Sequence, residues 1–217
     1  MKSDAQLRSD VLAELDWDPA IEAGAVGVSA TEGVVTLTGH LGSHAEKDAA
    51  ERAAQRVQGV KAIAVEITVK LPAGDERTNA DIARAAEHAL EWNVLVPNGK
   101  IKPMVEGGWV TLTGEVEWEY QRHAAEGAVR PLMGVRGVSN MIGISPKVRP
   151  ADVERKLREA LARQAKRESD RIQISVDGSK VALRGRVHSF TDYYAVRNAA
   201  WSVPGVSSVE NDLVVQD

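Results

Sequence analysis

The chain repeats one pattern three times, and this repeat limits its fold more than any other feature. In each copy a strand-like apolar run closes with one glycine, and an alanine-rich, helix-like run closes with a second. The two glycines stand 20 residues apart every time: Gly39 and Gly59, Gly114 and Gly134, Gly185 and Gly205. The copies begin 75 and then 71 residues apart, a longer period than the roughly 20–50 residues of solenoid repeats. The sequence therefore predicts three small tandem domains, over residues 1–72, 76–146 and 149–217.

Each copy predicts the same order of elements: helix, hairpin, helix and strand. A polar cap followed by apolar residues at helical spacing indicates the first helix, as in Ser3 followed by Leu7 and Val11. Alternating apolar and polar residues around a glycine turn then indicate two antiparallel strands. The predicted core contains one equivalent leucine from each first helix (Leu15, Leu90, Leu161). It also contains the inward pairs of each hairpin: Val35 and Leu37, Val110 and Leu112, Val181 and Leu183.

A second helix and a third strand complete each copy. Polar caps at Ser43 and Ser189 mark helix starts, and apolar strands follow over 63–69, 138–144 and 209–215. All six glycines named above are expected to be structural turn residues, with the one after each helix run at a left-handed helix C-terminus. The predicted fold class is α+β: three tandem α-β-β-α-β domains, each with two helices packed on one face of a three-stranded mixed sheet.

The charge is unevenly distributed along the chain. The net charge of −4 divides into −5 for residues 1–75 (7 basic, 12 acidic), −2 for residues 76–146 (7 and 9) and +3 for residues 147–217 (13 and 10). Nucleic-acid binders are usually basic throughout, so nucleic acid is not expected as a partner. No apolar run is long enough to span a membrane, and the N-terminus lacks the apolar stretch of a secretory leader. The expected compartment is the cytoplasm, or the periplasm only if a leader was removed.

No arrangement of residues typical of catalysis is present. The chain has no cysteine, which excludes disulfides and thiol chemistry. Ser and Thr residues at strand ends have no His or Asp partner at a recurring offset. His40 and His44 are four residues apart near Glu46, but the other copies have no histidine at these positions. We expect these residues to lie in a solvated loop, with no metal, no cofactor and no enzymatic activity.

Three tryptophans indicate a candidate contact surface. Trp17 and Trp92 stand at equivalent positions near the end of the first helix, and Trp201 lies on the second helix of the third copy. Tryptophans at a membrane interface would be one interpretation. Because Asp16 and Asp18 flank Trp17, packing between units or at a subunit interface is the favoured interpretation for that residue.

The strongest functional signal is a basic stretch in the third copy. It contains Arg155, Lys156, Arg158, Arg163, Lys166, Arg167 and Arg171. Four interspersed acids make a salt-bridged, solvated helix an equally good interpretation. A functional stretch would attract anionic phospholipid head groups at about 1 kcal/mol per basic residue near the surface. Weak, salt-sensitive lipid association, or contact with partner proteins, is the resulting hypothesis.

With these elements the chain resembles the bacterial BON domain family. The resemblance rests on the α-β-β-α-β unit, on the run of apolar residue, Thr, apolar residue, any residue and Gly that closes the strand, and on Gly-Val-x-x-Val followed by Asn140 or Asn211. The first copy has Val65 in place of this asparagine. The resemblance covers the whole chain in three copies. It implies a non-enzymatic module linked to osmotic and envelope stress that contacts phospholipid.

Two further classes of function stay open at this point. The small units could assemble chains into a homo-oligomer through exposed strand edges and tryptophans. The family resemblance also implies a potassium sensor as an alternative, because a bacterial potassium-binding protein carries one such domain.

Overall fold

The computed structural model describes residues 2–74, 76–146, 153–164 and 172–215, with the backbone alone described from 160 to 164. Unit 1 contains α1 (Asp4–Trp17), the short 3₁₀ turn η1 (Ala23–Ala25), β1 (Val26–Thr31), β2 (Val34–Leu41), α2 (His44–Arg56) and β3 (Ala62–Val69). Unit 2 contains α3 (Asn79–Trp92), β4 (Ile101–Glu106), β5 (Trp109–Val116), α4 (Glu119–Val129) and β6 (Gly137–Ile144). Unit 3 contains α5 (Val153–Gln164), β7 (Ile172–Asp177), β8 (Lys180–Val187), α6 (Phe190–Trp201) and β9 (Ser208–Val215).

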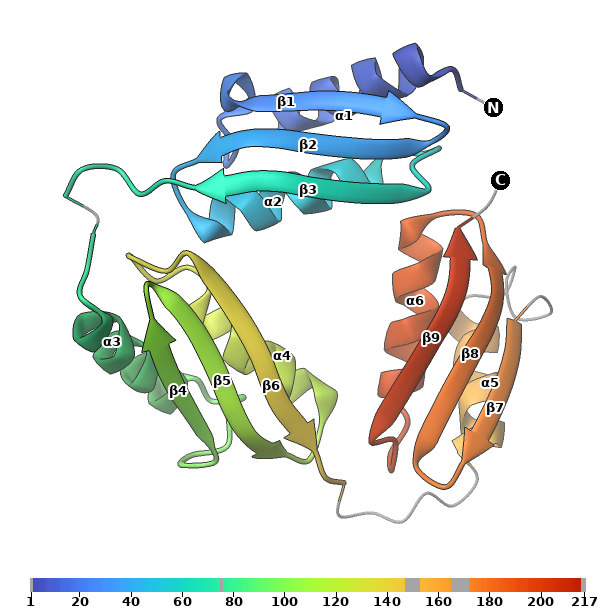
Figure 1. The fold of residues 1–217 in the computed structure, drawn as a ribbon. Helices are drawn as coiled ribbons and strands as arrows, with labels where there is room; N and C mark the ends of the chain where they lie inside the picture. Colours follow the sequence, from blue (N-terminus) through green and yellow to red (C-terminus); the bar gives the residue numbers. More distant parts are fainter. Residues whose placement is uncertain (1, 75, 147–152, 165–171, 216–217) are drawn as a thin grey trace.

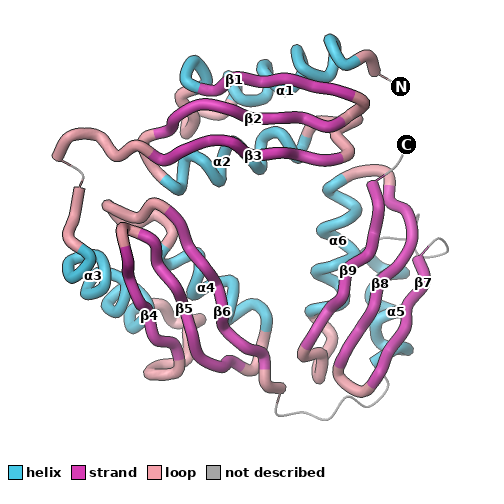
Figure 2. Tube along the Cα trace, in the orientation of Figure 1, coloured by secondary structure: helices cyan, strands magenta, loops and turns pink. Residues whose placement is uncertain are grey.

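The three units share one sheet topology. The second strand of each unit is central, pairing antiparallel with the first strand and parallel with the third. The register is the same each time, since the strand-closing glycines Gly39, Gly114 and Gly185 pair with the first residue of the preceding strand. Both helices lie on one face of each sheet, and the other face is open (Figures 1 and 2). The predicted α+β fold class is confirmed.

Each unit has a hydrophobic core of its own. The three clusters of buried residues are separate in sequence and fall one to a unit. All six residues of the predicted inward pairs are essentially inaccessible to solvent, and Leu15 and Leu90 are buried. The side chain of Leu161 lies outside the described residues. Binary patterning at strand and helix periods therefore placed these core positions correctly.

The glycine after each second helix is not the helix cap that the sequence suggested. Helix α2 already ends at Arg56, and Gly59 lies three residues later with φ of 98°. The N–H of Val60 donates to the carbonyl of Val57, so the glycine is the third residue of a β-turn with positive φ, as in a type II turn. Gly134 and Gly205 occupy the same turn position, and Pro204 precedes the latter.

The second helices face the middle of the molecule. Figure 1 shows the units at the sides of a triangle, with α2, α4 and α6 toward its centre and the first helices farther out. Among the described residues, no helix has both the length and the apolar character needed to cross a membrane.

Candidate functional site

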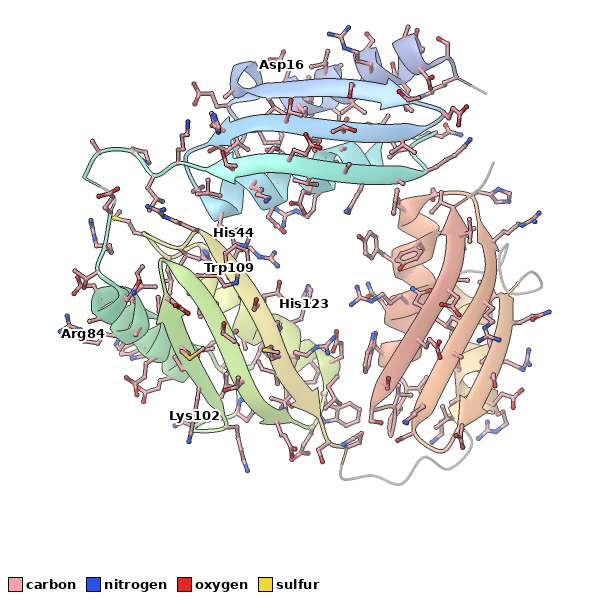
Figure 3. The ribbon with its side chains drawn as sticks, viewed as in Figure 1. Asp16, His44, Arg84, Lys102, Trp109 and His123 are labelled. Carbon is pink, nitrogen blue, oxygen red and sulfur yellow. The ribbon has the colours of Figure 1, made fainter. Side chains whose placement is uncertain are left out.

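One face of each second helix lines the place where the units meet. We define this inner face by positions with i, i+4, i+7 and i+11 spacing, which share one side of a helix. It consists of His44, Asp48, Glu51 and Gln55 in unit 1, of Glu119, His123, Glu126 and Arg130 in unit 2, and of Phe190, Tyr194, Arg197 and Trp201 in unit 3. Figure 3 shows His44 and His123 on the sides of their units that face the centre.

Units 1 and 2 meet through an ion pair. Oδ2 of Asp48 lies 3.0 Å from Nη1 of Arg130, with both side chains about four-fifths buried. Arg130 also pairs with Glu126 on its own helix. Burial would raise the pKa of the Glu126 carboxyl, but hydrogen bonds from Asn140 and Arg130 hold it below its usual value. The pair therefore joins the start of α2 to the end of α4.

His44 sits beside this ion pair without a partner of its own. Its Nδ1 atom is buried and makes no hydrogen bond, and it faces residues 130–135 across a cavity of about 200 Å³. Burial, and then the nearby Arg130 charge, lower the pKa of His44 below its usual value. A neutral imidazole at this position keeps a second positive charge away from Arg130.

Units 2 and 3 meet through an aromatic contact and a longer ion pair. The guanidinium of Arg122 lies 5.3 Å from the centre of the Trp201 ring, within the range of a cation–π interaction. Arg197 of α6 lies 3.8 Å from Glu119 at the start of α4. A cavity of about 890 Å³ opens beside these contacts, lined in part by Trp118, Tyr120 and Trp201.

Units 3 and 1 meet through the start of α6 and the end of α2. The Tyr194 side chain interacts with Gln55, and burial raises the pKa of the Tyr194 hydroxyl. Phe190 packs against the core cluster of unit 1. A central cavity of about 480 Å³ is lined by residues of α2, α4 and α6, including Arg52, Thr191 and His123. Side chains from all three units therefore meet at one point.

The predicted basic stretch is only partly described. Arg155 pairs with Glu159 at 2.7 Å, and Arg158 pairs with Glu154 at 2.9 Å, both at the i,i+4 spacing of exposed helix pairs. The side chain of Arg163 lies outside the described residues, as do Lys166, Arg167 and Arg171. The described part of the stretch therefore matches the salt-bridged, solvated helix more closely than a surface of unpaired charge.

Trp17 and Trp92 both end the first helix of their units and project into solvent, with 83% and 79% of their surface exposed. The predicted packing of Trp17 between units is therefore wrong, because most of its surface is exposed to solvent. Its place at a subunit interface stays a prediction. Trp201 instead lies at the junction of units 2 and 3.

Sequence reasoning missed an apolar tip in unit 2. We define the apolar tip as Trp92, Val94 and Leu95, which are 79%, 95% and 52% exposed. Trp92 is the last residue of α3, and Val94 and Leu95 lie in the turn that follows the cap residue Asn93. The available signal was a large apolar run, WNVLV, outside any periodic pattern. Three other exposed apolar side chains, Met104, Met141 and Val214, lie on strands.

The two histidines considered as metal ligands do not come together. Nδ1 of His40 contacts the Thr68 hydroxyl on β3, whereas His44 begins α2 and faces unit 2. Glu46 accepts hydrogen bonds from the backbone N–H groups of Gly42 and Glu22. Within the described part of the chain, no group of three acidic or histidine side chains is arranged to hold a metal ion.

Comparison with known proteins identifies the repeated unit. The sequence model of the BON domain matches residues 3–70, 78–146 and 151–217. The osmotically-inducible protein Y of Escherichia coli (strain K12) is 30% identical over 145 residues, which cover 63% of this chain and 70% of that protein.

Two solved structures of CdsD, a structural protein of the type III secretion system of Chlamydia trachomatis, align at 15% identity. The first alignment covers 97% of this chain and 92% of the CdsD chain. The second covers 100% of both chains. TM-scores of 0.27 and 0.26 are too low to support an inference. The three family matches, which together cover nearly the whole sequence, show that the chain belongs to the BON domain family.

Proposed function

We propose that this chain is a non-catalytic bacterial protein of the osmotic stress response that binds phospholipid surfaces, with the apolar tip of unit 2 as the contact. Relation to an osmotically-inducible protein supports the stress role. The observation that carries the binding proposal is the near-complete exposure of Val94 beside Trp92. Contiguous large apolar side chains are rarely left in water without a binding role.

The chemistry of the tip fits the boundary between head groups and acyl chains. Tryptophan is favoured at that depth, and aliphatic side chains such as Val94 and Leu95 gain by leaving water. Glu87 and Glu91 on α3 are exposed near the tip, so negatively charged head groups offer it no added attraction. Contact through the tip is therefore expected on zwitterionic and anionic bilayers alike.

The basic stretch of unit 3 supports a second contact of a different kind. Arg155 and Arg158 on α5 would require anionic lipid, and their attraction would decrease with salt. Because both are already ion-paired, we assign them the smaller contribution. The two contacts differ in lipid requirement and in salt dependence.

Liposome flotation separates these contacts. The Trp92→Ser/Val94→Ser/Leu95→Ser variant is expected to bind about a hundredfold more weakly than the wild type to both lipid types. Three apolar side chains together contribute on the order of 3 kcal/mol. An Arg163→Glu/Lys166→Glu/Arg167→Glu variant is expected to lose only a salt-sensitive part on anionic vesicles.

The matched control exchanges three exposed apolar side chains elsewhere, in Met104→Ser/Met141→Ser/Val214→Ser, and should float like the wild type. Equal loss in the control and the tip variant would contradict a specific tip contact. Absence of flotation for the wild type on every vesicle would overturn lipid binding and leave partner proteins as the alternative.

A further inference from the structure

We infer that the contact between α6 and α2 is a latch that closes the three units into a ring, and that opening it offers the same faces to a second copy of the chain. Figure 1 shows units 1 and 3 side by side at the closing corner of the triangle. Helices α2 and α6 are in contact there, although their units are the first and last of the chain. The inference adds an assembly surface to the proposed lipid contact and does not depend on it.

The contacts between units follow one pattern: the start of each second helix meets the end of the second helix of another unit. The start of α2 meets the end of α4 through Asp48 and Arg130. The start of α4 meets the end of α6 through Glu119 and Arg197. The start of α6 meets the end of α2 through Tyr194 and Gln55. Head-to-tail contacts of this kind close into a ring when the rotation between units permits, and three units complete it here.

The three junctions use different chemistry on corresponding faces of the second helices. Asp48, His123 and Tyr194 are equivalent, standing 9 residues after the glycines at 39, 114 and 185. An ion pair, a cation–π contact with a long ion pair, and an aromatic–amide contact do not substitute for one another. Such differences let each face accept its own neighbour and reject the others. The side chains of the inner faces therefore favour one cyclic order of the three units.

Unit 3 lacks a hydrogen bond that unit 2 makes at this surface. In unit 2, Nδ2 of Asn140 donates to Glu126 at 3.0 Å. The equivalent helix residue in unit 3 is Arg197, and Nδ2 of the equivalent Asn211 is buried with no hydrogen-bond partner. An unmade buried bond is unfavourable. Arg197, which stands in place of the acceptor Glu126, is the residue that pairs with Glu119 of unit 2.

The latch can open without unfolding a unit. Units 1 and 2, and units 2 and 3, are consecutive in the chain. Within the described residues, unit 3 is joined to unit 1 by side-chain contacts and by no backbone hydrogen bond. The buried residues of each unit form a separate core. Opening therefore exposes the faces of α2 and α6, together with Phe190 and the part of unit 1 that it covers. Linkage within one chain keeps the effective concentration of the two faces near the millimolar range. A second copy can take either face when the latch is open, which is the usual route to swapped oligomers.

Cross-linking tests the closed ring directly, because the chain has no native cysteine. Arg52 and Thr191 line the central cavity from α2 and α6. An Arg52→Cys/Thr191→Cys chain treated with a short bismaleimide at micromolar concentration should give an internally linked monomer in high yield. Adding Tyr194→Lys should lower that yield several-fold. Ser29→Cys/Thr191→Cys, with Ser29 exposed on β1, is the control and should give little product.

A mixture of two variants, each with one side of the latch disrupted, tests whether a second copy of the chain can bind the exposed faces. One chain carries Gln55→Lys with Thr191→Cys and keeps the unit 3 face; the other carries Tyr194→Lys with Arg52→Cys and keeps the unit 1 face. The mixture should give linked dimers, and the same mixture with Tyr194→Lys in both chains should not. A low yield of internally linked monomer from the Arg52→Cys/Thr191→Cys chain overturns the latch. Equal dimer yields in the two mixtures, including none in either, overturn the second copy as occupant.

Discussion

Exchanging Gly39 for alanine is expected to lower the free energy of unfolding of unit 1 by about 3 kcal/mol or more. Gly39 has φ of 127°, a region that other residues rarely adopt. A Cβ atom there would lie 2.1 Å from the carbonyl oxygen of Ala25, which is backbone and cannot rotate away. Relief would require the strand to leave its register with β1. Gly114 repeats this geometry against the carbonyl of Lys100, also at 2.1 Å.

Gly127 provides the matched control. It lies inside α4 and has no positive φ, and a Cβ atom added there would meet no atom within 4 Å beyond the backbone of its own helix. Gly127→Ala should therefore raise the free energy of unfolding by about 0.5–1 kcal/mol. Chemical denaturation followed by circular dichroism measures both changes. A Gly39→Ala protein as stable as the wild type would show that the strand end does not have this conformation.

The second large effect is expected from Leu112→Ala in unit 2. Leu112 is fully buried on the central strand β5, and removing such a side chain costs about 2–5 kcal/mol. A unit of about 70 residues has little stability to lose. We expect the variant to unfold unit 2 in a separate, earlier thermal transition while units 1 and 3 keep their cores.

Calorimetry and amide NMR spectra distinguish the outcomes for Leu112→Ala. Separate cores predict that signals of units 1 and 3 persist above the first transition. A single transition, shifted as a whole to lower temperature, would mean that the three units unfold as one cooperative body. Val94→Ala is the control, because a side chain 95% exposed should change stability by less than about 0.5 kcal/mol.

The repeat explains why so much of the fold could be predicted. Leu37, Leu112 and Leu183 recur at one position with one residue type, because each must fill the same space between sheet and helices. Three copies in register make such a pattern visible in a single sequence. The glycine after each helix was recognised but misplaced, since a turn glycine and a helix-cap glycine both require positive φ.

The inner faces could not be predicted for the opposite reason. Asp48, His123 and Tyr194 occupy one position with three residue types, so the repeat hides them. Asp48 and Tyr194 contact different units, and His123 lines the central cavity. The arrangement of the units is a tertiary property, which a local sequence pattern does not determine. The apolar tip was missed because Trp92 was considered singly, while Val94 and Leu95 lie outside both helix and strand periods.

Small-angle X-ray scattering from the unmodified chain tests the central claim, that the units form one closed ring. A closed ring predicts a concentration-independent monomer whose scattering profile matches the closed triangle of Figure 1. It also predicts that Tyr194→Lys increases the radius of gyration. A wild-type profile that requires an extended string of three units, unchanged by the substitution, would contradict it.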